Sequence, residues 1–179
     1  YGYTDKCRVD IKLTTDNDDL ETLYLDQNNF SWKNQGRKLP ILAYGSTRLL
    51  SKSSIPNTKY KGLRVNNLFN PVSRLVNANI WLKRLYKINR KAFDIVTNKI
   101  LREFLLLDDH QNIDKIDNII SINGTPMTQW SQGNKSVTGL VCDILMNMCE
   151  LWNDSEIENI TDYTGIVLID ELELHLHPS

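Results

Sequence analysis

The chain has 179 residues with a formal net charge of −1, and 41% of its residues are hydrophobic and 24% charged. These proportions are typical of a folded globular domain, and the near-zero charge argues against a global attraction to nucleic acid or membrane. The sequence opens without a signal peptide and has no apolar run of the roughly 18 residues that span a bilayer. We therefore expect a cytoplasmic protein with no membrane partner.

The cysteines are three in number, and no pair has the spacing of zinc ligands. Cys142 and Cys149 lie within a helical pattern, on roughly the same face. We interpret these two residues and Cys7 as buried thiols in a reducing compartment.

The first part of the chain predicts β-structure. Alternating apolar and polar residues indicate a half-buried strand over residues 7–13, and residues 21–25 predict a second strand that returns beside it. Residues 40–45 are mostly apolar and end at a glycine, as in a strand buried within a sheet. Residues 51–70 are rich in Ser, Asn and Lys and predict a surface loop with scope for movement.

The middle of the chain predicts a helical lobe inserted between strands of the sheet. Apolar residues at helical spacing indicate one helix from Asn77 to Ile88 and a second from Phe93 to Leu107. Five basic residues at helical spacing lie on the first helix, and they form either a DNA-binding stripe or, as is more usual, a solvated face. These residues are Lys83, Arg84, Lys87, Arg90 and Lys91.

The last third predicts a hairpin, a long helix and a strand. Residues 116–122 indicate a strand, and Asn123-Gly124 is a two-residue hairpin signal that returns the chain over residues 125–129. Apolar residues from Val137 to Trp152 follow the i, i+3, i+4, i+7 rule of an amphipathic helix. An acidic loop over residues 153–162 leads to a final strand at 165–169.

Two carboxylates follow that final strand directly. Its apolar run predicts a parallel strand covered on both faces, whose carboxyl end opens into a ligand crevice. There Asp170 is placed to hold Mg²⁺ through a water, and Glu171 to act as general base on a water that attacks the γ-phosphate. The alternative is a buried strand that ends in two solvated acids.

Ser131-Gln-Gly133 precedes the long helix. A hydroxyl, a glycine and free backbone N–H groups at a helix N-terminus make an anion site. Helix capping by Ser131 is the alternative and explains this segment equally well when it is taken alone. Lys135 either adds to the positive charge or faces solvent.

These segments resemble a known family. Trp130-Ser-Gln-Gly-Asn-Lys-Ser136 resembles the signature motif of ABC-type ATPases, and the strand with Asp170-Glu171 resembles their Walker B strand. The order of signature motif, helix and Walker B strand is similar to that in ABC, SMC and RecF-like ATPases. The resemblance is greatest to a prokaryotic AAA-labelled group related to the OLD and RecF families. The resemblance runs from about residue 40 to the end, and it includes Ile41–Arg48, Leu68-Phe-Asn-Pro71 with Trp81-Leu82, and the run from Asp170 to Pro178.

The resemblance implies roles for individual residues. Ser131 and Gly133 match positions that contact the γ-phosphate bound to the opposite subunit, Asp170 matches the Walker B aspartate and Glu171 the catalytic glutamate. Leu176-His177 matches the D-loop, so His177 is implied to sense or position nucleotide across the dimer; alternatively, His175 and His177 are a polar pair near a strand end. The sequence departs from the family pattern at Trp130, Gln132 and Leu172, without loss of a charged group.

The implied fold is α/β, a P-loop NTPase of ABC-ATPase type with a mixed sheet and an inserted helical lobe. We expect residues 1–179 to be a single partial domain, β-rich over about 1–50, loop and helical lobe over 51–115, and signature and Walker B part over 116–179. No G-x-x-x-x-G-K-[ST] loop occurs in the sequence, so we expect a fragment of a larger ATPase that is inactive alone.

The implied function is ATP hydrolysis with ATP and Mg²⁺, by a homodimer that closes around nucleotide. The resemblance further implies an effector such as a nuclease, a role in DNA repair or anti-phage defence, and contact with DNA. The alternatives are a non-hydrolysing nucleotide switch or DNA clamp of the same fold, a transporter ATPase, and an unrelated α/β domain with chance matches.

Overall fold

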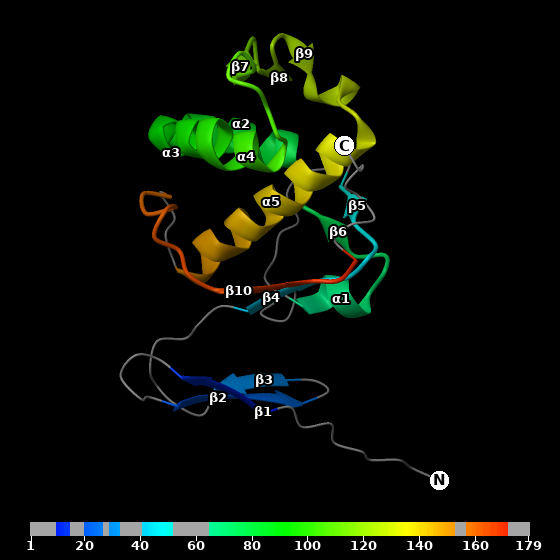
Figure 1. Cartoon of the computed structure of the whole chain (residues 1–179), viewed down its shortest axis with the longest axis vertical. Coiled ribbons are helices and arrows are strands. Elements are labelled where there is room, and N and C mark those ends of the chain that lie inside the picture. Colours follow the sequence, from blue (N-terminus) through cyan, green and yellow to red (C-terminus); the bar gives the residue numbers. More distant parts are fainter. Residues whose placement is uncertain are drawn as a thin grey trace. The chain divides into compact units, whose positions relative to one another are not determined.

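The computed structural model describes residues 10–14, 20–26, 29–32, 41–51, 65–152 and 157–171 (Figure 1). The chain divides into two compact units, residues 1–39 and 40–179. The first unit holds an antiparallel sheet in the order β1-β2-β3, formed by Asp10–Thr14, Leu20–Asp26 and Asn29–Trp32. The two predicted strands are confirmed where they are described, while Cys7 and its neighbours lie outside the described residues. Strand β3 is an element that the sequence pattern does not predict.

The second unit is built around a parallel pair of strands. Strand β4, Ile41–Tyr44, lies beside β10, Ile166–Ile169, with Tyr44 opposite Ile169. Both predicted strands are confirmed, as is the parallel direction predicted for β10, and β4 is almost wholly buried. The sequence pattern does not predict that these two strands are neighbours. The expectation that β10 is covered on both faces is wrong for the described structure, because Leu168 is 50% exposed. Among the described strands β10 pairs only with β4.

A long helix, α5 (Gln132–Leu151), lies between this strand pair and the helical lobe (Figure 1). One face of α5 packs Leu140 and Met148 against Leu42 and Tyr44 of β4. The other face packs residues that include the buried free thiols of Cys142 and Cys149 against the lobe, which confirms the prediction for these two cysteines. The apolar residues of α5 therefore pack in two separate clusters, one with β4 and one with the lobe. Within the described residues, no helix combines the length and the apolar character of a membrane span.

The helical lobe begins with α2, Ala78–Ile88, and continues through α3, Arg90–Ile95. Asn89 ends one helix and starts the next: its N–H bonds the Leu85 carbonyl at 2.8 Å, and its side chain accepts from the Ala92 N–H at 3.0 Å. The two predicted helices are confirmed, with the second beginning earlier than its apolar pattern indicates. The predicted basic stripe is therefore divided between two helices.

The second helix of the lobe widens as it proceeds. It passes from α3 into a π-helical stretch, η2 (Val96–Leu101), and ends in α4 (Arg102–Phe104). At this transition the buried Thr97 hydroxyl donates to the Phe93 carbonyl at 2.8 Å, a local bond that competes with regular helix geometry. Phe93 and Val96 are fully buried and pack in the same core as Trp81 and Leu85 of α2.

An antiparallel sheet connects the lobe to α5. It contains β7 (Ile113–Ile116), β8 (Ile119–Ile122) and β9 (Thr125–Pro126), followed by a short 3-10 helix, η3 (Met127–Gln129). The predicted turn at Asn123-Gly124 is confirmed, with φ of 48° and 82°. The strand predicted over residues 116–122 is confirmed for Ile119–Ile122 only, because Asp117 and Asn118 turn the chain with φ of 46° and 63°.

Short elements complete the second unit. Strand β5 (Leu49–Leu50) pairs in parallel with β6 (Arg74–Leu75), and α1 spans Asn66–Phe69. The expected loop over residues 51–70 thus contains a helical turn at its end, while residues 52–64 lie outside the described residues.

Candidate functional site

The acid pair follows β10 at the edge where both parallel strands end. The Asp170 N–H donates to the Tyr44 carbonyl at 2.9 Å and so extends the pairing with β4 by one step. Both acidic side chains are exposed. Glu171 has φ 49°, in the left-handed region that non-glycine residues seldom adopt. The strand therefore presents two carboxylates to solvent, on backbone whose course changes sharply after Asp170.

Arg48 fixes that backbone from the neighbouring strand end. One of its guanidinium nitrogens, Nη2, donates to the Asp170 carbonyl at 2.8 Å and to the Glu171 carbonyl at 3.2 Å. The Arg48 residue is only 7% exposed. The sequence analysis assigns no function to Arg48, although a basic residue shortly after the glycine that ends the adjacent strand is a usable signal.

The segment that carries Arg48 is itself clamped by Asn67 of α1. The Asn67 side chain accepts from the Gly45 N–H at 3.0 Å and donates to the carbonyls of Thr47 at 3.3 Å and Ser73 at 3.2 Å. A Cβ at Gly45 would lie 2.9 Å from the backbone carbonyl oxygen of Asn67, so this close approach requires glycine. Tyr44, Gly45 and Asn67 together determine where the Arg48 side chain begins.

The signature-like segment forms the start of α5. The Ser131 hydroxyl accepts from the Asn134 N–H at 3.1 Å, which confirms the N-cap interpretation. Trp130 is buried and anchors the segment by donating its indole N–H to the Thr125 carbonyl at 2.9 Å. The first amides of a helix lack intrahelical partners, so those of Gln132 and Gly133 face outward at this end. Anion binding here remains a prediction.

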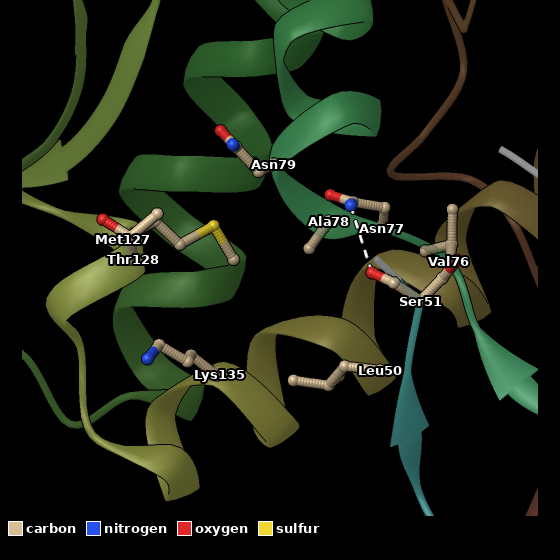
Figure 2. A pocket seen from close by; sticks show the side chains of 9 residues that line it. All are labelled: Leu50, Ser51, Val76, Asn77, Ala78, Asn79, Met127, Thr128 and Lys135. Carbon is tan, nitrogen blue, oxygen red and sulfur yellow. Dashed lines mark hydrogen bonds between the residues drawn. The ribbon is translucent and has the colours of Figure 1, made fainter. Parts of the chain in front are cut away.

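A pocket of about 430 Å³ opens beside this helix start. In the view of Figure 2, Met127, Thr128 and Lys135 stand on one side of it and Leu50 and Ser51 on the other. Lys135 is only partly exposed, so its side chain lines a pocket wall and does not extend freely into solvent. The remaining lining residues are Val76, Asn77, Ala78 and Asn79.

A half-buried carboxylate links α5 to the strand that pairs with β10. Asp143 accepts hydrogen bonds from the Tyr44 hydroxyl at 3.0 Å, the Val76 N–H at 2.7 Å and the Asn147 side chain at 2.9 Å. Burial raises the pKa of the Asp143 carboxyl, although these three bonds act in the opposite direction. Burial, and then the neighbouring Asp143 charge, raise the pKa of Tyr44. An acidic residue within the apolar run of the helix is the sequence signal for this contact.

The structure thus brings some predicted site residues together. Asp170 and Glu171 share one turn and one arginine partner. Ser131 and Gly133 belong to the start of α5, which reaches the acid pair's strands through Asp143 and Tyr44. His177, with Leu176 and His175, lies outside the described residues, so its role stays a prediction.

The exposed Asp170 carboxylate suits the needs of Mg²⁺, which keeps several waters and takes one or two carboxylates together with substrate phosphates. Within the described ranges no three His, Cys, Asp or Glu side chains are grouped as a metal cage.

Curated proteins similar to the chain include Septu protein PtuA of Bacillus mycoides, which is 33% identical over 181 residues, 97% of this chain and 24% of the relative. The retron Ec83 probable ATPase of Escherichia coli is 35% identical over 104 residues, 55% of this chain and 18% of that protein. The retron Vc95 probable ATPase of Vibrio cholerae is 32% identical over 117 residues, 60% of this chain and 22% of that protein.

The chain is thus homologous to PtuA and to retron probable ATPases, and it spans about a quarter of their length or less. No protein-family model matches the chain, and no solved structure matches it significantly. The chain itself is a mixed α/β structure with several small sheets.

Proposed function

We propose that the protein containing this chain binds and hydrolyses ATP as an ABC/SMC-like ATPase. The observation that carries the proposal is the acid pair Asp170–Glu171 at the carboxyl end of a parallel strand, with its backbone held by Tyr44 and Arg48. The names of two homologues, which describe them as probable ATPases, support it. The substrate is ATP, and the metal cofactor is Mg²⁺.

The two acids have different tasks in this proposal. Asp170 would hold Mg²⁺ at the strand end, and the metal would supply neutralisation of phosphate charge. The Glu171 carboxylate accepts a proton from water as the water oxygen forms a bond to the γ-phosphorus. The bond between that phosphorus and the bridging oxygen breaks, and its electron pair leaves with ADP. The loop that cradles the phosphates is supplied by a part of the protein outside this sequence.

The start of α5 acts in the second half of the site. Ser131 and the outward amides near Gly133 contact the γ-phosphate on the opposite subunit, so ATP closes a homodimer. His177 positions nucleotide across the same interface. Opening of the dimer after hydrolysis gates or drives an effector, such as a nuclease, in anti-phage defence or DNA repair. The exposed basic side chains of α2 and α3, including Arg84 and Lys87, are the surface offered to DNA.

Substitution of the general base tests the proposal in the full-length protein. Wild type is expected to hydrolyse ATP, and Glu171→Gln to lower kcat by about 10²- to 10⁴-fold and to trap an ATP-bound dimer seen by size-exclusion chromatography. Glu103→Gln, on an exposed acid of α4, is the matched control and should leave turnover unchanged. Turnover that survives in Glu171→Gln rejects the base assignment. A wild type that binds ATP without hydrolysing it rejects the ATPase and favours the nucleotide switch.

A further inference from the structure

We infer that Arg48 is a positioning residue for the acid pair: its guanidinium holds the backbone of Asp170 and Glu171 in the geometry that hydrolysis requires. The inference rests on the proposed ATPase function and deepens it. Arg48 contacts backbone carbonyl oxygens of the acid pair, so it acts through Glu171 and not on the substrate.

The first argument is the geometry of the contact. A single nitrogen, Arg48 Nη2, lies 2.8 Å and 3.2 Å from two consecutive carbonyl oxygens. Successive peptide groups of a strand point to opposite sides, so two carbonyls that face one donor require the chain to leave the strand conformation. The left-handed φ of Glu171 is that departure. Such a conformation persists in a non-glycine residue only where its surroundings impose it, and the Arg48 contact is one that does.

The second argument is the exposure of the carboxylate that Arg48 controls. The Glu171 side chain is exposed, so packing does little to fix its direction. The direction of its Cα–Cβ bond follows from the backbone, which the buried guanidinium holds. A displacement of about 1 Å in a catalytic group lowers a rate by about 100-fold. Backbone control by Arg48 is therefore sufficient to decide turnover.

The third argument is the choice of side chain. Each terminal guanidinium nitrogen carries two hydrogens in a fixed plane, so Nη2 can serve two acceptors in a defined geometry. A lysine ammonium is a rotatable point charge without that plane. The origin of the side chain is also fixed, because Asn67 clamps Gly45 and Thr47. Lysine at position 48 would keep the charge and lose the defined pair of bonds.

The test uses the full-length protein with Arg48→Ala and Arg48→Lys. We expect kcat to fall by about 100-fold in the alanine variant and about 10-fold in the lysine variant, with KM for ATP within a few-fold of wild type. Added guanidinium chloride, at concentrations far below those that unfold proteins, should restore part of kcat to Arg48→Ala only. The matched control is Arg102→Ala, which removes another arginine that bonds a backbone carbonyl, that of Asp108 at 2.7 Å, on the helical lobe.

Hydrogen exchange of the Asp170 amide separates failure of this inference from failure of the ATPase proposal. Faster exchange in Arg48→Lys, confined to the end of β10, supports the positioning role. This holds even if wild type does not hydrolyse ATP, because that result would reject only the ATPase proposal. Unchanged exchange overturns the inference in either case. Full kcat in Arg48→Lys with an active wild type also overturns the inference. Equal losses of kcat, nucleotide affinity and exchange protection throughout residues 40–171 overturn it too, because they would indicate a general structural role.

Discussion

The Tyr44 hydroxyl, at the end of β4, donates a 3.0 Å hydrogen bond to the Asp143 carboxylate in the middle of α5. The backbone carbonyl of the same tyrosine accepts the Asp170 N–H at 2.9 Å. Tyr44 therefore joins the helix that begins with the signature-like segment to the strand end that carries the acid pair. Because Asp143 also accepts from the Val76 N–H just before α2, this carboxylate connects the lobe to both the helix and the strand end.

Removal of the Tyr44 hydroxyl should destabilise the fold. Tyr44→Phe keeps the buried ring and leaves Asp143 with its bonds from Val76 and Asn147. A hydrogen bond to a charged group contributes about 1.5–3 kcal/mol, so at a pH above the raised pKa of Asp143 we expect the free energy of unfolding to fall by about 2 kcal/mol. Denaturant unfolding followed by circular dichroism measures this change.

Tyr86→Phe is the control for that substitution. The Tyr86 ring packs edge-on against Phe93 and lies under Arg90, and both contacts use the ring and not the hydroxyl. We expect a change within about 0.5 kcal/mol. Equal losses in the two variants would show that the Tyr44–Asp143 bond contributes nothing specific.

The raised pKa of Asp143 predicts a particular pH dependence of stability. Its pKa lies above the ordinary value of 3.8, chiefly because of burial. The folded chain therefore binds more protons at this group than the unfolded chain between 3.8 and the raised pKa. Its stabilising contribution is complete below 3.8 and is lost as pH rises through the raised pKa, at no more than about 1.4 kcal/mol per pH unit.

Asp143→Asn isolates this effect because asparagine does not titrate. We expect the free energy of unfolding of wild type, relative to that of the variant, to decrease as pH rises above 3.8 and then to level off. Urea unfolding of both proteins from about pH 4 to pH 7 gives the comparison. A difference that is independent of pH, or that grows with pH, would contradict the raised pKa.

Local signals predicted the elements that local chemistry determines. Asn123-Gly124 turns the chain as its residue types indicate, and Ser131 caps α5. The sequence pattern misses the turn at Asp117-Asn118, because the isoleucines at 116, 119, 120 and 122 favour one strand over residues 116–122. Asp and Asn both tolerate positive φ, so the signal was present but was outweighed by hydrophobicity.

Contacts between distant segments were not predictable in the same way. Arg48 meets the carbonyls of Asp170 and Glu171 only because β4 and β10 pair in parallel and end together. Neither an arginine after a glycine nor an aspartate within an amphipathic helix specifies its partner. The sequence located the acid pair and the helix start, whereas the fold supplies the two side chains, Arg48 and Asp143, that hold these segments in place.

Gly45 is predicted to be intolerant of a side chain. In Gly45→Ala the new Cβ would lie 2.9 Å from the backbone oxygen of Asn67, which cannot rotate away. We expect overpacking to lower the free energy of unfolding by about 1–3 kcal/mol and to disturb the approach of Arg48. Denaturant unfolding measures the first effect, and hydrogen exchange of the Asp170 amide measures the second.

Gly139→Ala is a useful comparison for Gly45→Ala. Its Cβ would meet the end of the Leu50 side chain, at 2.5 Å, and that side chain can change rotamer. Alanine in a helix interior also gains about 1 kcal/mol over glycine, which offsets the repacking. The loss of stability should therefore be smaller than for Gly45→Ala, and a larger loss would mean that the Asn67 contact does not constrain Gly45.

Ser131 has two proposed roles, and substitutions can separate them. Its hydroxyl caps α5 through the Asn134 N–H, and capping by a side-chain oxygen contributes about 1 kcal/mol. Ser131→Ala removes both the cap and the hydroxyl, whereas Ser131→Asn keeps an acceptor oxygen suited to capping and removes the hydroxyl. We expect the free energy of unfolding to fall in Ser131→Ala and to be retained in Ser131→Asn.

The rate of ATP hydrolysis by the full-length protein then decides between the roles. If the Ser131 hydroxyl contacts the γ-phosphate across the dimer, both variants lose turnover, because the larger asparagine side chain occupies the space needed by the phosphate. If Ser131 is only a helix cap, Ser131→Asn hydrolyses ATP like wild type, and Ser131→Ala loses turnover only to the extent that it is less stably folded. Turnover that tracks the cap would remove Ser131 from the nucleotide site and leave α5 with a structural N-terminus.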